Sequence, residues 1–148
     1  MNNIKFIVFD YDGVFTDGNI IFDNDGNIIK KYNVKDGYGI KLLKNKNIKI
    51  GVISGYKQNI SQKSILEHLN IDFIELGCNN KLEVLNKWCK ILNIDIKKNV
   101  CYMGDDLNDM NVINNVYFSS CPQDAHNELL NIVDFVSKKK GGNGCIRE

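Results

Sequence analysis

Residues 4–18 read IKFIVFDYDGVFTDG and carry the strongest structural signal in the chain. The first six residues form an apolar run interrupted only by Lys5, which is typical of a strand buried on both faces of a sheet. The run stops at Asp10, and Asp12 follows two positions later. Side chains two residues apart in an extended backbone point the same way. The sequence therefore predicts paired carboxylates where a buried strand ends.

Short apolar runs and longer amphipathic segments alternate along the rest of the chain. Further strands are predicted at 48–53, 71–76, 100–103, 116–119 and 133–136. Helices are predicted at 36–46, with Asp36 as a cap, and at 58–69, 80–92, 107–113 and 125–132. This alternation indicates an α/β fold with a doubly wound, Rossmann-like parallel sheet. We expect Trp88, Tyr102 and Phe118 to lie in its core.

One segment breaks the alternation. The apolar arms at 19–22 and 27–30 flank Asp23-Asn24-Asp25-Gly26, whose Asp-Gly pair is a strong hairpin turn signal. We therefore expect a β-hairpin insertion at about 18–34, within one domain that spans residues 1–148. Both hairpin faces are partly apolar, and a lone two-stranded hairpin is marginal in water, so one face needs a cover.

The composition argues against several classes of protein. The 148 residues include 19 basic and 18 acidic ones, and this balance does not favour nucleic-acid binding. No apolar run approaches the ~20 residues of a membrane span, and the N-terminus leads directly into a strand rather than a signal peptide. The 5 scattered cysteines and 2 isolated histidines predict neither a disulfide framework nor a zinc site. We expect a soluble, cytoplasmic protein with no nucleic-acid or membrane partner.

Polar residues also follow the other predicted strands. Ser54 and Gly55 come after the second strand, Lys81 opens the third helix, and GDDLND at 104–109 follows the fourth strand. Because the carboxyl ends of parallel strands meet at one edge of a sheet, we expect these residues to lie near the paired carboxylates. Hydroxyl, amide and ammonium donors in that place could hold a phosphoryl group.

The aspartates in these segments could equally be turn formers or helix caps. Together, however, they place Asp10, Asp12 and Asp105 near one edge, with Asp106 and Asp109 as further candidates. Such a concentration of like charge is unfavourable without a cation. Carboxylates with open water positions suit Mg²⁺, so a catalytic metal site is favoured over simple capping.

The motifs resemble, in order, the four motifs of phosphatases of the haloacid dehalogenase superfamily. They are D-x-D-G-V-x-T-D-G at 10–18, I-S-G at 53–55, Lys81, and G-D-D-x-N-D at 104–109. The chain further resembles the small tetrameric branch that acts on 3-deoxy-octulosonate 8-phosphate or nonulosonate 9-phosphates. The string D-G-x-G-I-K-L-L at 36–43 and the glycine-rich tail at 141–148 support this branch.

The resemblance implies Mg²⁺-dependent hydrolysis of a keto-acid sugar phosphate, in lipopolysaccharide or sialic acid biosynthesis. Asp10 would be the nucleophile that forms an aspartyl-phosphate, and Asp12 would be the general acid and base. The metal ligands would be Asp10, the backbone carbonyl of Asp12, and Asp105. Asp106 and Asp109 would act in the shell around these ligands.

The resemblance also implies the remaining parts of the site. Ser54, Gly55 and Lys81 would bind the phosphoryl oxygens. No large cap domain is expected, because hairpins of a homotetramer would partly cover the sites. The tail at 141–148 is expected to reach away from its own domain and to bring Arg147, the only arginine in the chain, to a neighbouring subunit's substrate.

Three alternatives stay open. Octulosonate-phosphate phosphatases usually have Gly-Arg after the second strand, whereas this chain has Gly55-Tyr56, so a nonulosonate or another sugar phosphate is an alternative substrate. The chain could instead be a catalytically weak tetramerisation module, as in the phosphatase-like half of some CMP-acylneuraminate synthetases, although the motif residues are retained. A phosphomutase or phosphonatase of the same superfamily is the third alternative, but these normally have larger caps.

Overall fold

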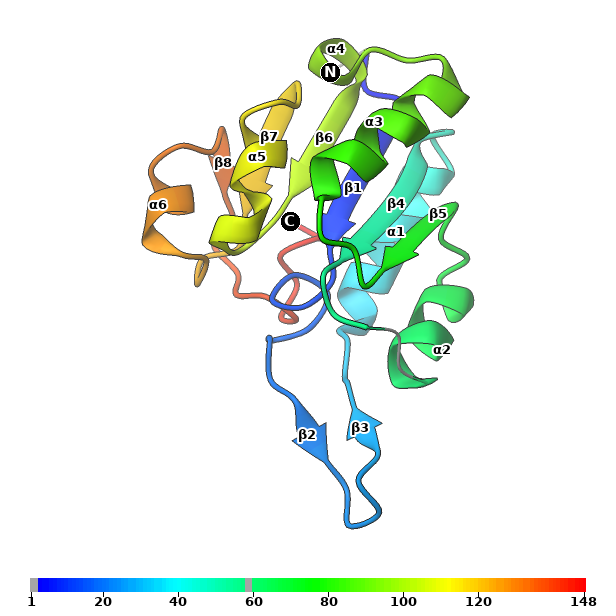
Figure 1. The fold of residues 1–148 in the computed structure, drawn as a ribbon, viewed down its shortest axis with the longest axis vertical. Coiled ribbons are helices and arrows are strands. Elements are labelled where there is room, and N and C mark those ends of the chain that lie inside the picture. Colours follow the sequence, from blue (N-terminus) through cyan, green and yellow to red (C-terminus); the bar gives the residue numbers. More distant parts are fainter. Residues whose placement is uncertain (1–2, 58–59) are drawn as a thin grey trace.

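The computed structural model describes residues 3–57 and 60–148, and a 6-stranded parallel sheet lies at its centre (Figure 1). The strand order is β5-β4-β1-β6-β7-β8. The strands are β1 (Phe6–Asp10), β4 (Lys49–Ser54), β5 (Phe73–Leu76), β6 (Val100–Met103), β7 (Phe118–Cys121) and β8 (Phe135–Val136). The chain winds outward from β1 in both directions, which confirms the predicted doubly wound sheet and places a topological switch point beside β1.

Helices cover both faces of the sheet (Figure 1). They are α1 (Val34–Lys44), α2 (Ile60–His68), α3 (Lys81–Leu92), α4 (Ile96–Asn99), the 3₁₀ helix η1 (Leu107–Asp109), α5 (Met110–Ile113) and α6 (Asn127–Leu130). Alternate side chains of β1 enter two separate cores. Phe6 and Val8 pack in the core that includes α3 and α5, and Phe9 packs in the core that includes α1 and α2. This explains why the first apolar run is nearly continuous.

Most predicted element boundaries are within two or three residues of those in the structure. The helix predicted at 58–69 is observed as α2, and residues 58–59 lie outside the described residues. Trp88 and Tyr102 are buried as predicted, but Phe118 is 39% exposed at the start of β7, so its placement in the core was wrong.

The first helix is not capped by Asp36, contrary to the sequence-based prediction. Asn33 is its N-cap, and its side chain accepts a backbone hydrogen bond from the first turn of α1. Asp36 is instead fully buried, and its carboxylate accepts the N–H groups of Gly144 (3.0 Å) and Arg147 (2.8 Å). This side chain therefore fixes the C-terminal tail to α1.

The C-terminal tail packs against its own chain, so the expectation that it reaches away was wrong. The N–H of Gly142 donates to the carbonyl oxygen of Val14 (3.0 Å), and the side chain of Cys145 is buried beside the same carbonyl. A Cβ atom at Gly141 would lie 1.9 Å from the carbonyl oxygen of Gly13. The tail glycines thus permit close contact with the loop after β1, rather than freedom of the chain.

The predicted hairpin is present and projects away from the sheet (Figure 1). It consists of β2 (Ile21–Phe22) and β3 (Ile28–Ile29), which pair in antiparallel register. The loop is longer than a two-residue Asp-Gly turn, because the backbone N–H of Asp23 donates to the carbonyl oxygen of Asn27 (3.0 Å) and leaves residues 24–26 between them. The carboxylate of Asp23 also accepts the backbone N–H of Asn27 (2.8 Å). Gly26 supplies the positive φ (+80°) that this loop needs.

Replacement of Asp36 by alanine should lower the free energy of unfolding by about 1–3 kcal/mol, because a buried N–H group of the tail (Gly144) and a partly buried one (Arg147) would lose their acceptor. Denaturant titration followed by circular dichroism measures this change. Asp25→Ala, on the exposed hairpin loop, is the control and should shift the free energy by less than about 0.5 kcal/mol. Equal stability of the Asp36 variant and the wild-type protein would show that this carboxylate does not anchor the tail.

Candidate active site

A polar pocket of about 430 Å³ lies at the carboxyl ends of the central strands. Asp10 is the last residue of β1, and Ser54 is the last residue of β4. The residues that line the pocket are Asp10, Asp12, Gly18, Ser54, Gly55, Tyr56, Asp105, Asp106 and Asn108. The sheet topology therefore brings three of the four sequence motifs to one cavity, as expected for an open α/β sheet.

Lys81, the third motif in chain order, does not line the pocket itself but joins Asp10, which does, to the buried Asp109. Its ammonium nitrogen is 2.9 Å from Asp10 and 2.7 Å from Asp109, and its side chain is only 4% exposed. The hydroxyl of Tyr102 donates a second hydrogen bond to Asp109 (2.5 Å). Burial and the charge of Asp109 raise the pKa of Asp10 to about 6, despite the opposing effect of Lys81. The base of the site is thus a buried, charged network.

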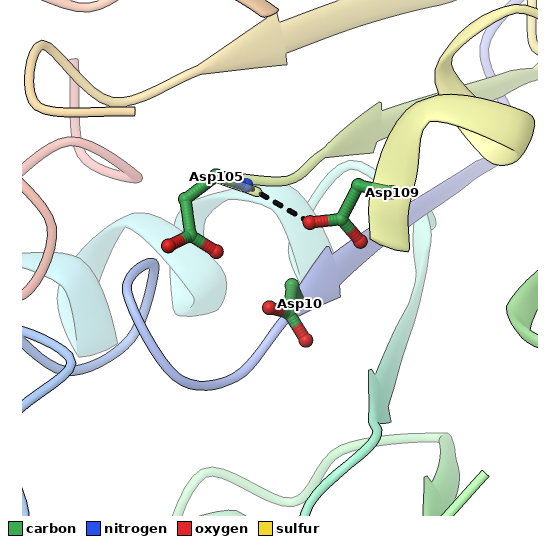
Figure 2. Close-up of side chains that lie close together, drawn as sticks. All are labelled: Asp10, Asp105 and Asp109. Atoms are coloured by element: carbon green, nitrogen blue, oxygen red, sulfur yellow. Dashed lines mark hydrogen bonds between the residues drawn. The ribbon is translucent and has the colours of Figure 1, made fainter. Parts of the chain in front are cut away.

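Asp109 orients the loop after β6 instead of facing the pocket. Its other carboxylate oxygen accepts the backbone N–H groups of Asp105 (3.0 Å) and Asp106 (3.3 Å), and the bond to Asp105 is drawn in Figure 2. The side chain of Asp106 caps η1 by accepting the N–H of Leu107. Asp106 also lines the pocket. The two aspartates therefore differ in role: buried Asp109 supports the loop, and Asp106 borders the cavity.

Asp105 has the features of a metal ligand. One carboxylate oxygen from each of Asp10, Asp105 and Asp109 lies within 4.8 Å of the other two. Figure 2 shows the three side chains together. Among the described residues, Oδ1 of Asp105 is buried without a hydrogen-bond partner. Burial and the charges of Asp10 and Asp109 raise its pKa to about 9. A buried oxygen without a donor, surrounded by like charge, fits a hard divalent cation at this point.

Asp12 borders the same pocket from the loop after β1. Its side chain is 26% exposed, and one of its oxygens pairs with the ammonium group of Lys30. The hydroxyl of Thr16 lies 3.5 Å from the same oxygen. The side chain of Asp12 is therefore held at the edge of the cavity, where it can exchange a proton with a bound molecule.

Ser54 and Gly55 line the same pocket as these carboxylates. The hydroxyl oxygen of Ser54 accepts the backbone N–H of Tyr56 (3.1 Å), which closes a tight turn after β4. Arg147, by contrast, does not line the pocket of its own chain. Its guanidinium lies over the ring of Tyr38, 5.7 Å from the ring centroid.

Sequence reasoning missed two contributors to the site. Lys30 follows β3 in the hairpin and reaches Asp12, and no motif distinguishes it from the other lysines of the chain. Tyr102 was assigned to the core, which is correct, but its hydroxyl also binds Asp109. Its position one residue before the end of β6, beside the strand-end motif, was a signal that could have been used.

Comparison with known proteins agrees with this geometry. The family model for haloacid dehalogenase-like hydrolases matches residues 18–147. The 3-deoxy-D-manno-octulosonate 8-phosphate phosphatase of Escherichia coli K12 is 36% identical over 146 residues, which cover 99% of this chain and 77% of that protein. The phosphatase of the same name from Yersinia pestis is 35% identical over the same shares of the two chains.

Solved structures give the same result. The crystal structure of the Yersinia pestis phosphatase has a TM-score of 0.93 and 34% identity, and the match covers 98% of this chain and 77% of that one. The Moraxella catarrhalis phosphatase, crystallised with magnesium, phosphate and KDO, has a TM-score of 0.93 and 30% identity, with coverage of 98% and 82%. The chain belongs to the haloacid dehalogenase-like hydrolases, in the branch of the 3-deoxy-D-manno-octulosonate 8-phosphate phosphatases.

Proposed function

We propose that this hydrolase removes phosphate from 3-deoxy-D-manno-octulosonate 8-phosphate, with Mg²⁺ as its cofactor. The observation that carries the proposal is the convergence of Asp10, Lys81 and the unpartnered oxygen of Asp105 at the base of one pocket. The magnesium, phosphate and sugar acid bound by the Moraxella relative support the same chemistry.

The reaction begins with Asp10. One of its carboxylate oxygens attacks phosphorus, the bond from phosphorus to the sugar oxygen breaks, and Asp12, acting as the general acid, gives a proton to that leaving oxygen. Water then attacks the aspartyl-phosphate, and Asp12, now a carboxylate, accepts a proton from it. The bond from phosphorus to Asp10 breaks, which releases inorganic phosphate and restores both carboxyl groups.

Three groups are proposed to hold the metal: the carboxylates of Asp10 and Asp105 and the backbone carbonyl of Asp12. When bound, Mg²⁺ offsets the repulsion between the nucleophile and the phosphoryl oxygens. Asp109 already accepts hydrogen bonds at both oxygens, so we assign it to the support of Lys81 and of the loop that carries Asp105.

Binding of the phosphoryl group is assigned to Ser54, Gly55 and Lys81. The side chain of Ser54 is buried at the pocket wall, and the Lys81 ammonium is fixed by two carboxylates, so these donors need little reorganisation when the substrate arrives. Pre-organised donors of this kind are most effective when charge develops on the phosphoryl oxygens.

The choice of an eight-carbon sugar is supported by the relatives, which are named 3-deoxy-D-manno-octulosonate 8-phosphate phosphatases. Tyr56 borders the pocket where the octulosonate enzymes usually have arginine, so a nonulosonate 9-phosphate is the competing substrate. Phosphate release from matched eight-carbon and nine-carbon keto-acid phosphates tests the proposal. A higher kcat/KM for the nine-carbon ester would overturn the eight-carbon assignment and leave the phosphatase mechanism intact.

The hairpin supports the proposal that the chain assembles as a homotetramer. Ile21 and Ile29 are each 45% exposed, and Phe22 is 63% exposed, on a two-stranded sheet that projects away from the body of the protein. Such a sheet is marginal by itself in water, so burial against the hairpins of other copies would stabilise it. The assembly would also cover an active site that has no large cap.

We also propose a cytoplasmic location. The five cysteines are unpaired thiols in the structure, which agrees with a compartment that keeps thiols reduced. Within the described part of the chain, no helix is long and apolar enough to cross a membrane.

Replacement of Asp10 by asparagine should reduce kcat by at least roughly a thousandfold, because the amide is a poor nucleophile. Steady-state phosphate release measures the loss, and thermal unfolding verifies that the variant is folded. Glu67→Gln, an exposed change on α2, is the control and should keep wild-type activity. Turnover of the Asp10 variant close to that of the wild-type protein would exclude the covalent mechanism.

Addition of Mg²⁺ should raise the Tm of the wild-type protein, since a ligand that binds only the folded state stabilises it by roughly 2.7 kcal/mol at a hundredfold excess over Kd. Differential scanning fluorimetry with and without EDTA measures the shift. Asp105→Asn should remove most of it, and Glu67→Gln should retain it. A full shift in the Asp105 variant would mean that the ion binds at another place.

The double variant Ile21→Lys with Ile29→Lys should dissociate the tetramer, because the two side chains are cross-strand neighbours on one hairpin face. Light scattering after size-exclusion chromatography reports the assembly state, and activity is measured on the same fractions. Ile91→Lys, at an isoleucine of α3 that is 64% exposed, is the matched control and should leave the assembly unchanged. A wild-type protein that is monomeric would rule out this assembly.

A further inference from the structure

Lys30 is an unusual residue for its position in the chain. It directly follows β3 of the projecting hairpin, where neighbouring apolar side chains are exposed, yet its own side chain is only 1% exposed. Burial of a lysine costs side-chain entropy and hydration of the charge, so such residues are rarely buried without a partner. The partner here is Asp12. The hairpin thus places a buried cation at the active-site pocket.

The contacts of Lys30 fix one side of the Asp12 carboxylate. Its ammonium group pairs with Oδ1, and the hydroxyl of Thr16 lies 3.5 Å from the same oxygen. In the described part of the chain, both of these contacts fall on Oδ1, which leaves Oδ2 for the pocket. The Lys30 ammonium also lies 5.1 Å from the ring centroid of Tyr56, a favourable cation–π position. The Lys30 ammonium is therefore held by two residues that line the pocket, Asp12 and Tyr56.

We propose that Lys30 is a positioning residue for Asp12, and that it holds Oδ1 so that Oδ2 transfers the proton in both steps of catalysis. The proposal rests on the proposed phosphatase mechanism, in which Asp12 is the acid and base. A group that transfers protons must lie within hydrogen-bond reach of the reacting oxygen. The side chain of Asp12 is a quarter exposed and extends from a loop, so an anchored oxygen restricts its rotation.

This role predicts a specific kinetic pattern. With a sugar phosphate, loss of Lys30 should slow both steps, since both depend on Asp12. With p-nitrophenyl phosphate, the leaving phenolate needs no proton, so Asp10 should still be phosphorylated quickly. Hydrolysis of the aspartyl-phosphate should then become slow, and p-nitrophenolate should appear in a burst stoichiometric with the enzyme, followed by slow turnover.

The test compares Lys30→Met with Lys31→Met. The adjacent lysine is 72% exposed and pairs with Asp17 outside the pocket, so it is a matched control that should leave kcat and KM unchanged. For Lys30→Met we expect kcat on the sugar phosphate to fall roughly tenfold to a hundredfold with little change in KM. Mass spectrometry should detect phosphorylated enzyme during turnover of p-nitrophenyl phosphate, and thermal unfolding verifies folding.

A double-variant cycle separates positioning from a general structural effect. If Lys30 acts through Asp12, combining Lys30→Met with Asp12→Asn should cost no more activity than Asp12→Asn alone. Losses that multiply, or an unchanged kcat in Lys30→Met, would overturn the inference. If Lys30→Met does not fold, Lys30→Gln, which keeps a donor for Oδ1 without the charge, serves in the same cycle.

The same data distinguish failure of this inference from failure of the proposed function. Full activity of Asp12→Asn itself would reject the mechanism on which the inference rests. Loss of activity in Asp12→Asn together with wild-type kinetics in Lys30→Met would retain the mechanism and reject only the role of Lys30.

Discussion

The ammonium group of Lys81 between Asp10 and Asp109 is the interaction on which the active site depends. It joins the end of β1, the start of α3 and the end of η1 through contacts of 2.9 Å and 2.7 Å. Buried ion pairs of this kind seldom add net stability, but the loss of one partner leaves an uncompensated charge and costs about 3–5 kcal/mol. Burial of these charged groups therefore costs stability, and apolar burial in the two cores on either side of β1 must offset that cost. The value of the network lies in fixing the position of Asp10, the proposed nucleophile.

The motif glycines follow from the same crowding of carboxylates. A Cβ atom at Gly13 would lie 1.9 Å from Oδ2 of Asp105, and one at Gly104 would lie 2.4 Å from Cγ of Asp109. Both glycines therefore let a carboxylate approach the backbone more closely than any side chain would allow. The glycines in the D-x-D-G and G-D-D strings are therefore required by close packing, in addition to the chemistry of the neighbouring aspartates.

Much of the fold and site was predictable because it rests on local pattern. Apolar periodicity located the strands, and residues at strand ends must meet at one edge of a parallel sheet. What could not be predicted depends on contacts between distant residues. The sequence pattern predicted Asp36 as a helix cap, but its carboxylate oxygens accept backbone N–H groups that lie 108 and 111 residues further along the chain. The tail glycines looked like a flexible linker, since composition alone does not separate freedom from close contact. Nothing in the sequence distinguishes Lys30 from the other lysines, and only the fold shows that it pairs with Asp12.

The hairpin joins two properties that sequence analysis treats separately. Its strands expose apolar side chains that need a partner, and the residue that follows β3 brings a buried cation to Asp12. A two-stranded sheet is only marginally stable by itself, so the order of the hairpin depends on the contacts that it makes. Any contact that holds the hairpin in place also holds the ammonium of Lys30. The proposed assembly and the proposed proton transfer by Asp12 would therefore be coupled through one short segment, because residues 21–30 supply the surface for the first and the charge for the second. In the proposed assembly, neighbouring subunits would contribute to the order of an active site that has no large cap.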